Sequence, residues 1–131
     1  MTPNGIVALG AVLGGVAVGV GAFGAHGLAG RVSPEMLSVF EIGVRYQMYH
    51  ALALVLLGLF AGRGPAPAPL EIPPSVGPAA WLFVAGIVLF SGSLYALVLT
   101  GTRWLGAITP IGGVAFLVGW AMFARAALLR A

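Results

Sequence analysis

Apolar residues follow one another along most of this chain in four long stretches, with polar residues and prolines between them. The stretches cover about residues 6–28, 35–62, 79–100 and 105–129. Each reaches the roughly 20 apolar residues that a helix needs to cross the hydrocarbon core of a bilayer. The pattern therefore predicts an all-α protein, a single integral membrane domain in which four transmembrane helices form a bundle.

Start and stop signals pair these predicted helices into two hairpins. Ser33 is a favourable N-cap, and Pro34 suits the first position of a helix. Residues 63–78 are rich in proline, which neither continues a helix nor pairs in a sheet, so we expect a semi-extended connector there. The short turn at residues 101–103 predicts that the third and fourth helices are antiparallel neighbours.

The composition agrees with a protein whose solvent is lipid. Hydrophobic residues make up 60% of the chain and charged residues 7%, whereas a soluble domain carries about 25% charged residues. The arginines are scattered along the chain, which argues against a nucleic-acid interface and favours contacts with phosphate headgroups. Cysteine is absent, which excludes disulfides and thiolate sites. The bilayer is therefore the expected partner.

The arginines also suggest an orientation in the membrane. The connector and the last helix carry Arg63, Arg125 and Arg130, and the opposite side carries Arg31 and Arg103, with Arg45 added if that residue is shallow. Cytoplasmic loops are enriched in arginine and lysine, and the small difference between the two sides favours both termini in the cytoplasm of a bacterial cell. The first span lacks the basic start of a secretory signal and is longer than one, so we expect it to be retained.

A polar cluster interrupts the second predicted helix. It consists of Glu41, Arg45, Tyr46, Gln47, Tyr49 and His50. At 3.6 residues per turn, Glu41, Arg45 and Tyr49 share one face, and Tyr46 and His50 lie on the adjoining face. An exposed i, i+4 ion pair is worth about 0.3–0.5 kcal/mol, but a lone charge at mid-membrane costs about 2.5–3.5 kcal/mol. Two interpretations follow: a structural ion pair near the interface, or a site for a headgroup, an ion or a proton.

Small residues recur at helical spacing along the first predicted helix. Gly10, Gly14, Ala17, Gly21 and Gly24 line one face. A second small face beside it contains Gly15, Gly19 and Ala22. Small residues allow helix backbones to approach closely in lipid. The first interpretation is helix packing within the bundle, and the alternative is a face for a homo-oligomer.

The two histidines do not predict a metal or haem site within one chain. If residues 29–33 close a hairpin, His50 lies about 20 Å deeper along the bundle than His26. One iron or zinc ion cannot bridge that distance, so we predict no cofactor and no metal ligand. A His50 that is hydrogen-bonded to Gln47 or to a tyrosine is expected instead, and a site shared by His50 of two protomers is the alternative.

The third predicted helix contains two serines near its middle, Ser91 and Ser93. Serines in lipid commonly bond to carbonyls of their own helix or allow close packing. A nucleophilic serine would require a base and an oxyanion hole, and no elbow motif accompanies this pair. We therefore predict no catalytic residue.

Four blocks of the sequence carry a resemblance to a known family. They are GAFGAHGL at residues 21–28, SPEMLSVFEIGVRYQMYHALAL at 33–54, FSGSLY at 90–95 and LGAITPIGG at 105–113. In this order they resemble the domain-of-unknown-function 423 family of small bacterial inner-membrane proteins, which has relatives in eukaryotes. The resemblance implies an integral membrane protein of four helices. It implies no activity for any residue.

Two classes of function follow from these observations. The first is a non-enzymatic structural or accessory subunit that packs with itself or within a larger membrane complex. The second is a small dimeric transporter or channel, with the polar cluster lining a path. Arg45, one turn from Glu41, favours the ionised carboxylate, which suits a fixed ion pair better than a proton shuttle. An enzyme would need Ser91 or Ser93 within reach of a histidine.

Overall fold

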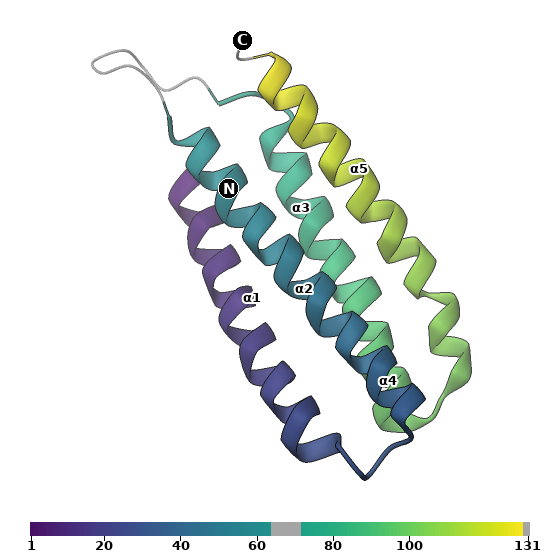
Figure 1. Cartoon of the computed structure of the whole chain (residues 1–131). Coiled ribbons are helices and arrows are strands. Elements are labelled where there is room, and N and C mark those ends of the chain that lie inside the picture. Colours follow the sequence, from purple (N-terminus) through teal and green to yellow (C-terminus); the bar gives the residue numbers. More distant parts are fainter. Residues whose placement is uncertain (64–71, 130–131) are drawn as a thin grey trace.

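The computed structural model describes residues 1–63 and 72–129, which form helices joined by short turns and contain no strand. Within them, four long apolar helical spans lie side by side, at Pro3–Leu28, Pro34–Ala61, Val76–Thr100 and Arg103–Leu128 (Figure 1). Each is long and apolar enough to cross a membrane. The predicted all-α bundle of four transmembrane helices is therefore confirmed.

Three of the four spans contain a short turn of a different helical type. The first consists of α1, Pro3–Phe23, and a π-helical turn, Gly24–Leu28, and the second is α2, Pro34–Ala61, without such a turn. The third consists of α3, Val76–Gly86, a π-helical turn, Ile87–Ser91, and α4, Gly92–Thr100. The fourth begins with a 3₁₀ turn, Arg103–Ala107, and continues as α5, Thr109–Leu128.

The helix boundaries differ from the predicted ones mainly around the connector. Residues 76–78, which were predicted to belong to the connector, form the first turn of α3. Pro78 is tolerated there because a backbone N–H in the first turn has no partner within the helix. The remaining connector prediction, a semi-extended segment, falls largely on residues 64–71, which lie outside the described residues, as does Arg130. At the start of α2, Ser33 caps the helix as expected, and its hydroxyl accepts a hydrogen bond from the Met36 amide over 3.2 Å.

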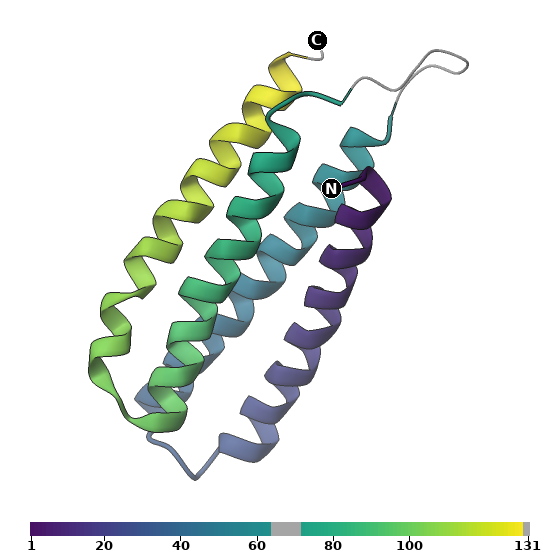
Figure 2. The same cartoon turned by 180° about the vertical axis from the view of Figure 1, so that it is seen from behind.

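The bundle is built from two antiparallel hairpins. In the first, α1 packs on α2, and in the second, α3 and the π turn after it pack on α5. The two hairpins meet along α2, which also contacts α3 and α4. The first and last described turns lie at one end of the bundle, and the α1–α2 loop and α4–α5 turn lie at the other (Figures 1 and 2). The α4–α5 turn depends on Gly101, whose φ of 71° is left-handed.

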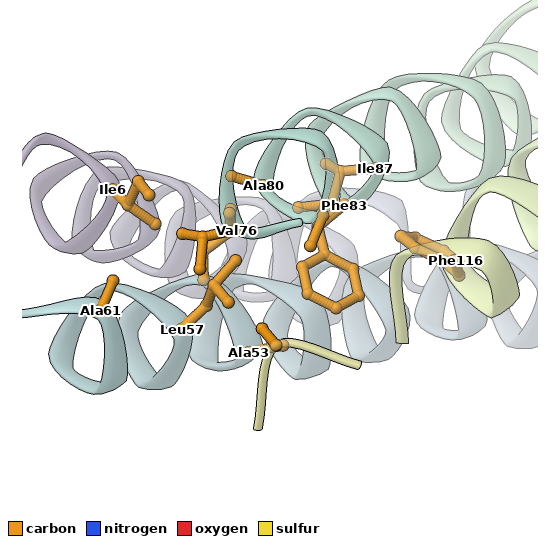
Figure 3. Close-up of a cluster of buried hydrophobic side chains, with 12 residues drawn as sticks. Ile6, Ala53, Leu57, Ala61, Val76, Ala80, Phe83, Ile87 and Phe116 are labelled. Carbon is orange, nitrogen blue, oxygen red and sulfur yellow. The ribbon is translucent and has the colours of Figure 1, made fainter. Parts of the chain in front are cut away.

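Buried apolar side chains form two clusters. The larger lies toward the end of the bundle where α1 begins, and Figure 3 shows part of it, including Ile6, Leu57, Val76 and Phe83 from three helices. The smaller is centred on Phe40, Leu28 and Val98 near the opposite end. Along α2, buried polar residues occupy the positions between these two clusters, and they form the site described next.

Candidate functional site

Gln47 connects three helices through its side-chain amide. It is buried on α2, with 3% of its surface exposed. Its Nε2 donates to the backbone carbonyl of Leu13 on α1 over 2.9 Å, and its Oε1 accepts from the Tyr95 hydroxyl on α4 over 2.9 Å. Both ends of the amide therefore have partners, and the arrangement holds the two hairpins together.

His50 lies one turn further along α2 and connects it to α5. Its Nδ1 is 2.8 Å from the Tyr46 carbonyl, and its Nε2 is 3.2 Å from the indole nitrogen of Trp120. A carbonyl only accepts and an indole N–H only donates, so the hydrogen lies on Nδ1 and Nε2 accepts. The Phe116 ring stacks on the imidazole at 3.4 Å between centroids. His50 therefore has a hydrogen-bond partner at each ring nitrogen, as a neutral imidazole.

This arrangement partly matches the expected partners of His50. The predicted tyrosine contributes its main-chain carbonyl instead of its hydroxyl, and the Gln47 side chain bonds elsewhere. The second partner, Trp120, was not singled out in the sequence. It lies 70 residues further along the chain, and no local pattern indicates that its indole turns toward α2.

The two serines of the third span have different surroundings. The Ser93 hydroxyl donates to the Phe90 carbonyl of its own helix over 2.9 Å and lies 2.8 Å from the Thr109 hydroxyl of α5. Ser91 is fully buried near the Tyr95 hydroxyl, but its own hydroxyl makes no hydrogen bond to a described residue. Neither serine is hydrogen-bonded to a histidine among the described residues. Ser93 therefore links the third span to α5.

Glu41 and Arg45 lie on the outer surface, apart from the buried Gln47 and His50. Arg45 Nη2 and Glu41 Oε2 are 3.2 Å apart, and the two side chains are 57% and 53% exposed. Tyr49 is also exposed, and Tyr46 is partly exposed while its ring stacks on Phe90. The predicted cluster thus consists of an inner pair that joins helices and an outer group that faces the surroundings of the bundle.

A groove adjoins the outer ion pair between α1 and α2. Its volume is about 230 Å³, and it is lined by Gly21, Gly24, Phe40, Glu41, Val44 and Arg45. The glycines leave room there because they lack side chains. The groove therefore combines an apolar floor with one positive and one negative group.

The glycine positions of the first helix lie against α2. A Cβ atom at Gly10 would come within 2.7 Å of the Ala51 carbonyl oxygen, and one at Gly24 would come within 2.9 Å of the Phe40 ring. Gly14 lies near Ala51 and Met48, and Gly21 near Val44. This face therefore serves helix packing inside the chain. The second small face is open at Gly15 and Gly19, where an added Cβ would meet nothing within 4 Å.

The remaining predicted polar point, His26, does not join this site. It is exposed in the π turn that ends the first span. Among residues 1–63 and 72–129, no group of three or more His, Cys, Asp or Glu residues is placed to hold a metal ion. The described polar residues therefore form hydrogen bonds between helices and one surface ion pair, without a cluster of metal ligands.

Comparison with known proteins identifies relatives over almost the whole chain. A family model described as "Protein of unknown function (DUF423)" matches residues 20–113. The UPF0382 membrane protein SAB0533 of Staphylococcus aureus is 52% identical over 116 residues, which cover 88% of each chain. The UPF0382 membrane protein YwdK of Bacillus subtilis is 50% identical over 122 residues, which cover 93% of this chain and 94% of the relative.

No solved structure matches this chain. The predicted resemblance is confirmed by the family model and by the relatives, which are themselves membrane proteins by name. The match includes the second helix with both parts of its polar cluster and the start of α5. The chain therefore belongs to the DUF423 family of membrane proteins of unknown function.

Proposed function

We propose that this protein is a non-enzymatic accessory or structural subunit of the bacterial cytoplasmic membrane, with both termini in the cytoplasm. The observation that carries this proposal is the complete hydrogen bonding of Gln47 and His50, the two buried polar residues of α2. Gln47 is bonded at both ends of its amide, and His50 is bonded at both ring nitrogens. Groups engaged in this way join helices and are not available to a substrate.

The outer faces of the bundle are the second support for a subunit role. Large apolar side chains project from α1 and α5, and these two helices bury less of their surface than the two central spans. Among them, Val12 and Val18 on α1 are each 63% exposed, and Leu117 on α5 is 71% exposed. Such faces fit lipid or the helices of a neighbouring protein, because helix association in a bilayer depends on packing.

Affinity capture from native membranes tests the proposal. Tagged protein is extracted in mild detergent, and the captured proteins are quantified by mass spectrometry. Stoichiometric recovery of one membrane complex supports an accessory subunit. Recovery of the protein without a partner complex, either alone or as a homo-oligomer, contradicts the accessory role.

Two surface variants serve as matched probes in the same capture experiment. Val12→Ala and Leu117→Ala shorten exposed side chains on the two outer helices, α1 and α5, and leave the buried clusters unchanged. If a partner packs on one face, the corresponding variant lowers its recovery and the other does not. Equal recovery with both variants would place the partner on neither face.

A further inference from the structure

The groove beside Glu41 and Arg45 has the features of a lipid site. Its apolar floor comes from Phe40 and Val44 on α2 and from the glycines at the end of the first span. At about 230 Å³ it is smaller than the pockets of about 300–1,000 Å³ that enclose a whole small ligand. It therefore fits a segment of a chain-like molecule, the rest of which lies outside the groove.

The ion pair lies in the outer half of the hydrocarbon core, on the side of the α1–α2 loop. The 28 residues of α2 span about 42 Å, so each end extends about 6 Å beyond a hydrocarbon core of about 30 Å when the helix is centred. Glu41 lies seven residues after Pro34, about 10 Å from the start of the helix, and so about 4 Å below the hydrocarbon boundary; Arg45 lies about 16 Å from the start, about 10 Å below that boundary. Helical side chains lean toward the N-terminal end, which here is the nearer membrane surface.

The ion pair leaves hydrogen-bonding capacity for a ligand. In the described part of the chain, the bond between Arg45 Nη2 and Glu41 Oε2 is the only one that either side chain makes. A guanidinium has five N–H donors, and a carboxylate accepts at both oxygens. Below the hydrocarbon boundary water is scarce, so the remaining donors and acceptors favour a ligand with complementary groups.

We propose that this groove binds a zwitterionic phospholipid whose headgroup carries a primary amine. The phosphate accepts hydrogen bonds from Arg45, the ammonium group donates to Glu41, and the upper part of one acyl chain lies along Gly21 and Gly24. An anionic headgroup without an amine would meet the Glu41 carboxylate without a compensating positive charge. A choline headgroup has no N–H to donate.

The glycines are the second requirement of this site. An added Cβ would lie 2.9 Å from the Phe40 ring at Gly24 and 3.1 Å from Val44 Cγ1 at Gly21. A side chain at either position would therefore push against α2 and displace Phe40 or Val44, which line the groove. Backbone alone forms this wall of the groove, which allows a lipid chain to approach closely.

Lipid retention by the purified full chain tests the proposal. The protein in detergent receives phosphatidylethanolamine, phosphatidylglycerol or phosphatidylcholine, and native mass spectrometry measures the one-to-one adduct. We expect phosphatidylethanolamine to be retained about tenfold more tightly than phosphatidylcholine, equivalent to about 1.4 kcal/mol. Glu41→Gln is expected to abolish this preference, and Arg45→Gln to weaken retention of all three lipids.

Matched variants separate the groove from charge in general. Glu35→Gln and Arg31→Gln remove one charge each at the same end of the bundle but do not line the groove. Both should retain the wild-type preference. Val44→Leu keeps both charges, adds volume in the groove and should lower retention of all three lipids.

Three results would overturn the proposal. The first is wild-type retention of phosphatidylglycerol equal to or above that of phosphatidylethanolamine, which would indicate a plain arginine–phosphate contact. The second is an equal loss of preference in Glu35→Gln and Glu41→Gln. The third is wild-type retention of phosphatidylethanolamine that is no higher than its retention of phosphatidylcholine. Melting temperatures measured without added lipid show whether each variant is folded.

Discussion

Trp120 of α5 donates its indole N–H to Nε2 of His50 on α2 over 3.2 Å, and this bond joins the second hairpin to the first. The opposite nitrogen of the same imidazole is held by the Tyr46 carbonyl. Phe116, one turn from Trp120, stacks on the ring. The imidazole is thus fixed in position from two helices, and its contacts with Trp120 and Phe116 link α5 to α2.

Replacing Trp120 with phenylalanine tests the contribution of this bond. Trp120→Phe removes the N–H donor but keeps an aromatic ring near Phe83 and Phe123. Hydrogen bonds between transmembrane helices contribute about 0.6 kcal/mol on average and up to about 1.7 kcal/mol. We expect Trp120→Phe to lower the free energy of unfolding, measured in detergent or bicelles, by an amount within that range. Trp81→Phe, at a tryptophan that is 60% exposed, is the control and should change it little.

Replacing Gln47 should lower the free energy of unfolding more than removing one of its two hydrogen bonds. Gln47→Leu leaves the Tyr95 hydroxyl without its acceptor and removes the bond to Leu13 on α1. An unsatisfied buried polar group costs about 1–3 kcal/mol. We expect Gln47→Leu to lower the free energy of unfolding by about this amount, and Tyr95→Phe to lower it less. Equal losses in the two variants would show that the Leu13 bond contributes nothing.

Two glycines of α1 offer a matched test of the helix contact. A Cβ at Gly10 would lie 2.7 Å from the Ala51 carbonyl oxygen and 2.8 Å from the Val55 amide nitrogen, whereas one at Gly15 would meet nothing within 4 Å. Backbone atoms cannot move aside as a flexible side chain can, so Gly10→Ala must separate α1 from α2. Overpacking of this kind costs about 1–3 kcal/mol.

Gly15→Ala is the control for that substitution. It adds the same methyl group to the same helix without a steric contact in the chain. We expect its free energy of unfolding to equal or slightly exceed that of the wild type, since alanine favours a helix over glycine. If Gly15→Ala were as destabilising as Gly10→Ala, the face at Gly15 would be in contact with another protein molecule.

The helices themselves could be predicted from the sequence because each span is long and apolar, and because capping residues such as Ser33 act locally. The Glu41–Arg45 ion pair could also be predicted from the sequence, since it needs only the i, i+4 spacing of one helix. Local rules do not determine which face of α2 turns inward. That choice depends on α1, α4 and α5 together, and it separates the buried Gln47 from the exposed Arg45.

The hydrogen-bond partners of the buried residues could not be predicted either, because they also depend on how the helices pack together. Gln47 meets Tyr95, 48 residues away, and His50 meets Trp120, 70 residues away. These pairings depend on the register between hairpins. The π turn at residues 87–91 also has no signal in the sequence, although it shifts the register of α4 by one residue relative to α3.

The absence of cysteine from the chain allows a direct test of membrane orientation. Asn4 and Ala29 are exposed at opposite ends of the first span. If both termini are cytoplasmic, a membrane-impermeant maleimide added to intact cells should label Ala29→Cys and leave Asn4→Cys unlabelled. Permeabilised cells provide the control, because both positions should then react.

The reverse pattern would place the ion pair of Glu41 and Arg45 near the cytoplasmic surface instead of the outer one, because this pair lies toward the same end of the bundle as the α1–α2 loop. The buried hydrogen bonds of Gln47 and His50 are independent of this result, since they lie within the bundle. Orientation therefore decides which leaflet supplies the lipid for the groove. Labelling of both positions in intact cells would indicate a mixed population and would contradict a single orientation.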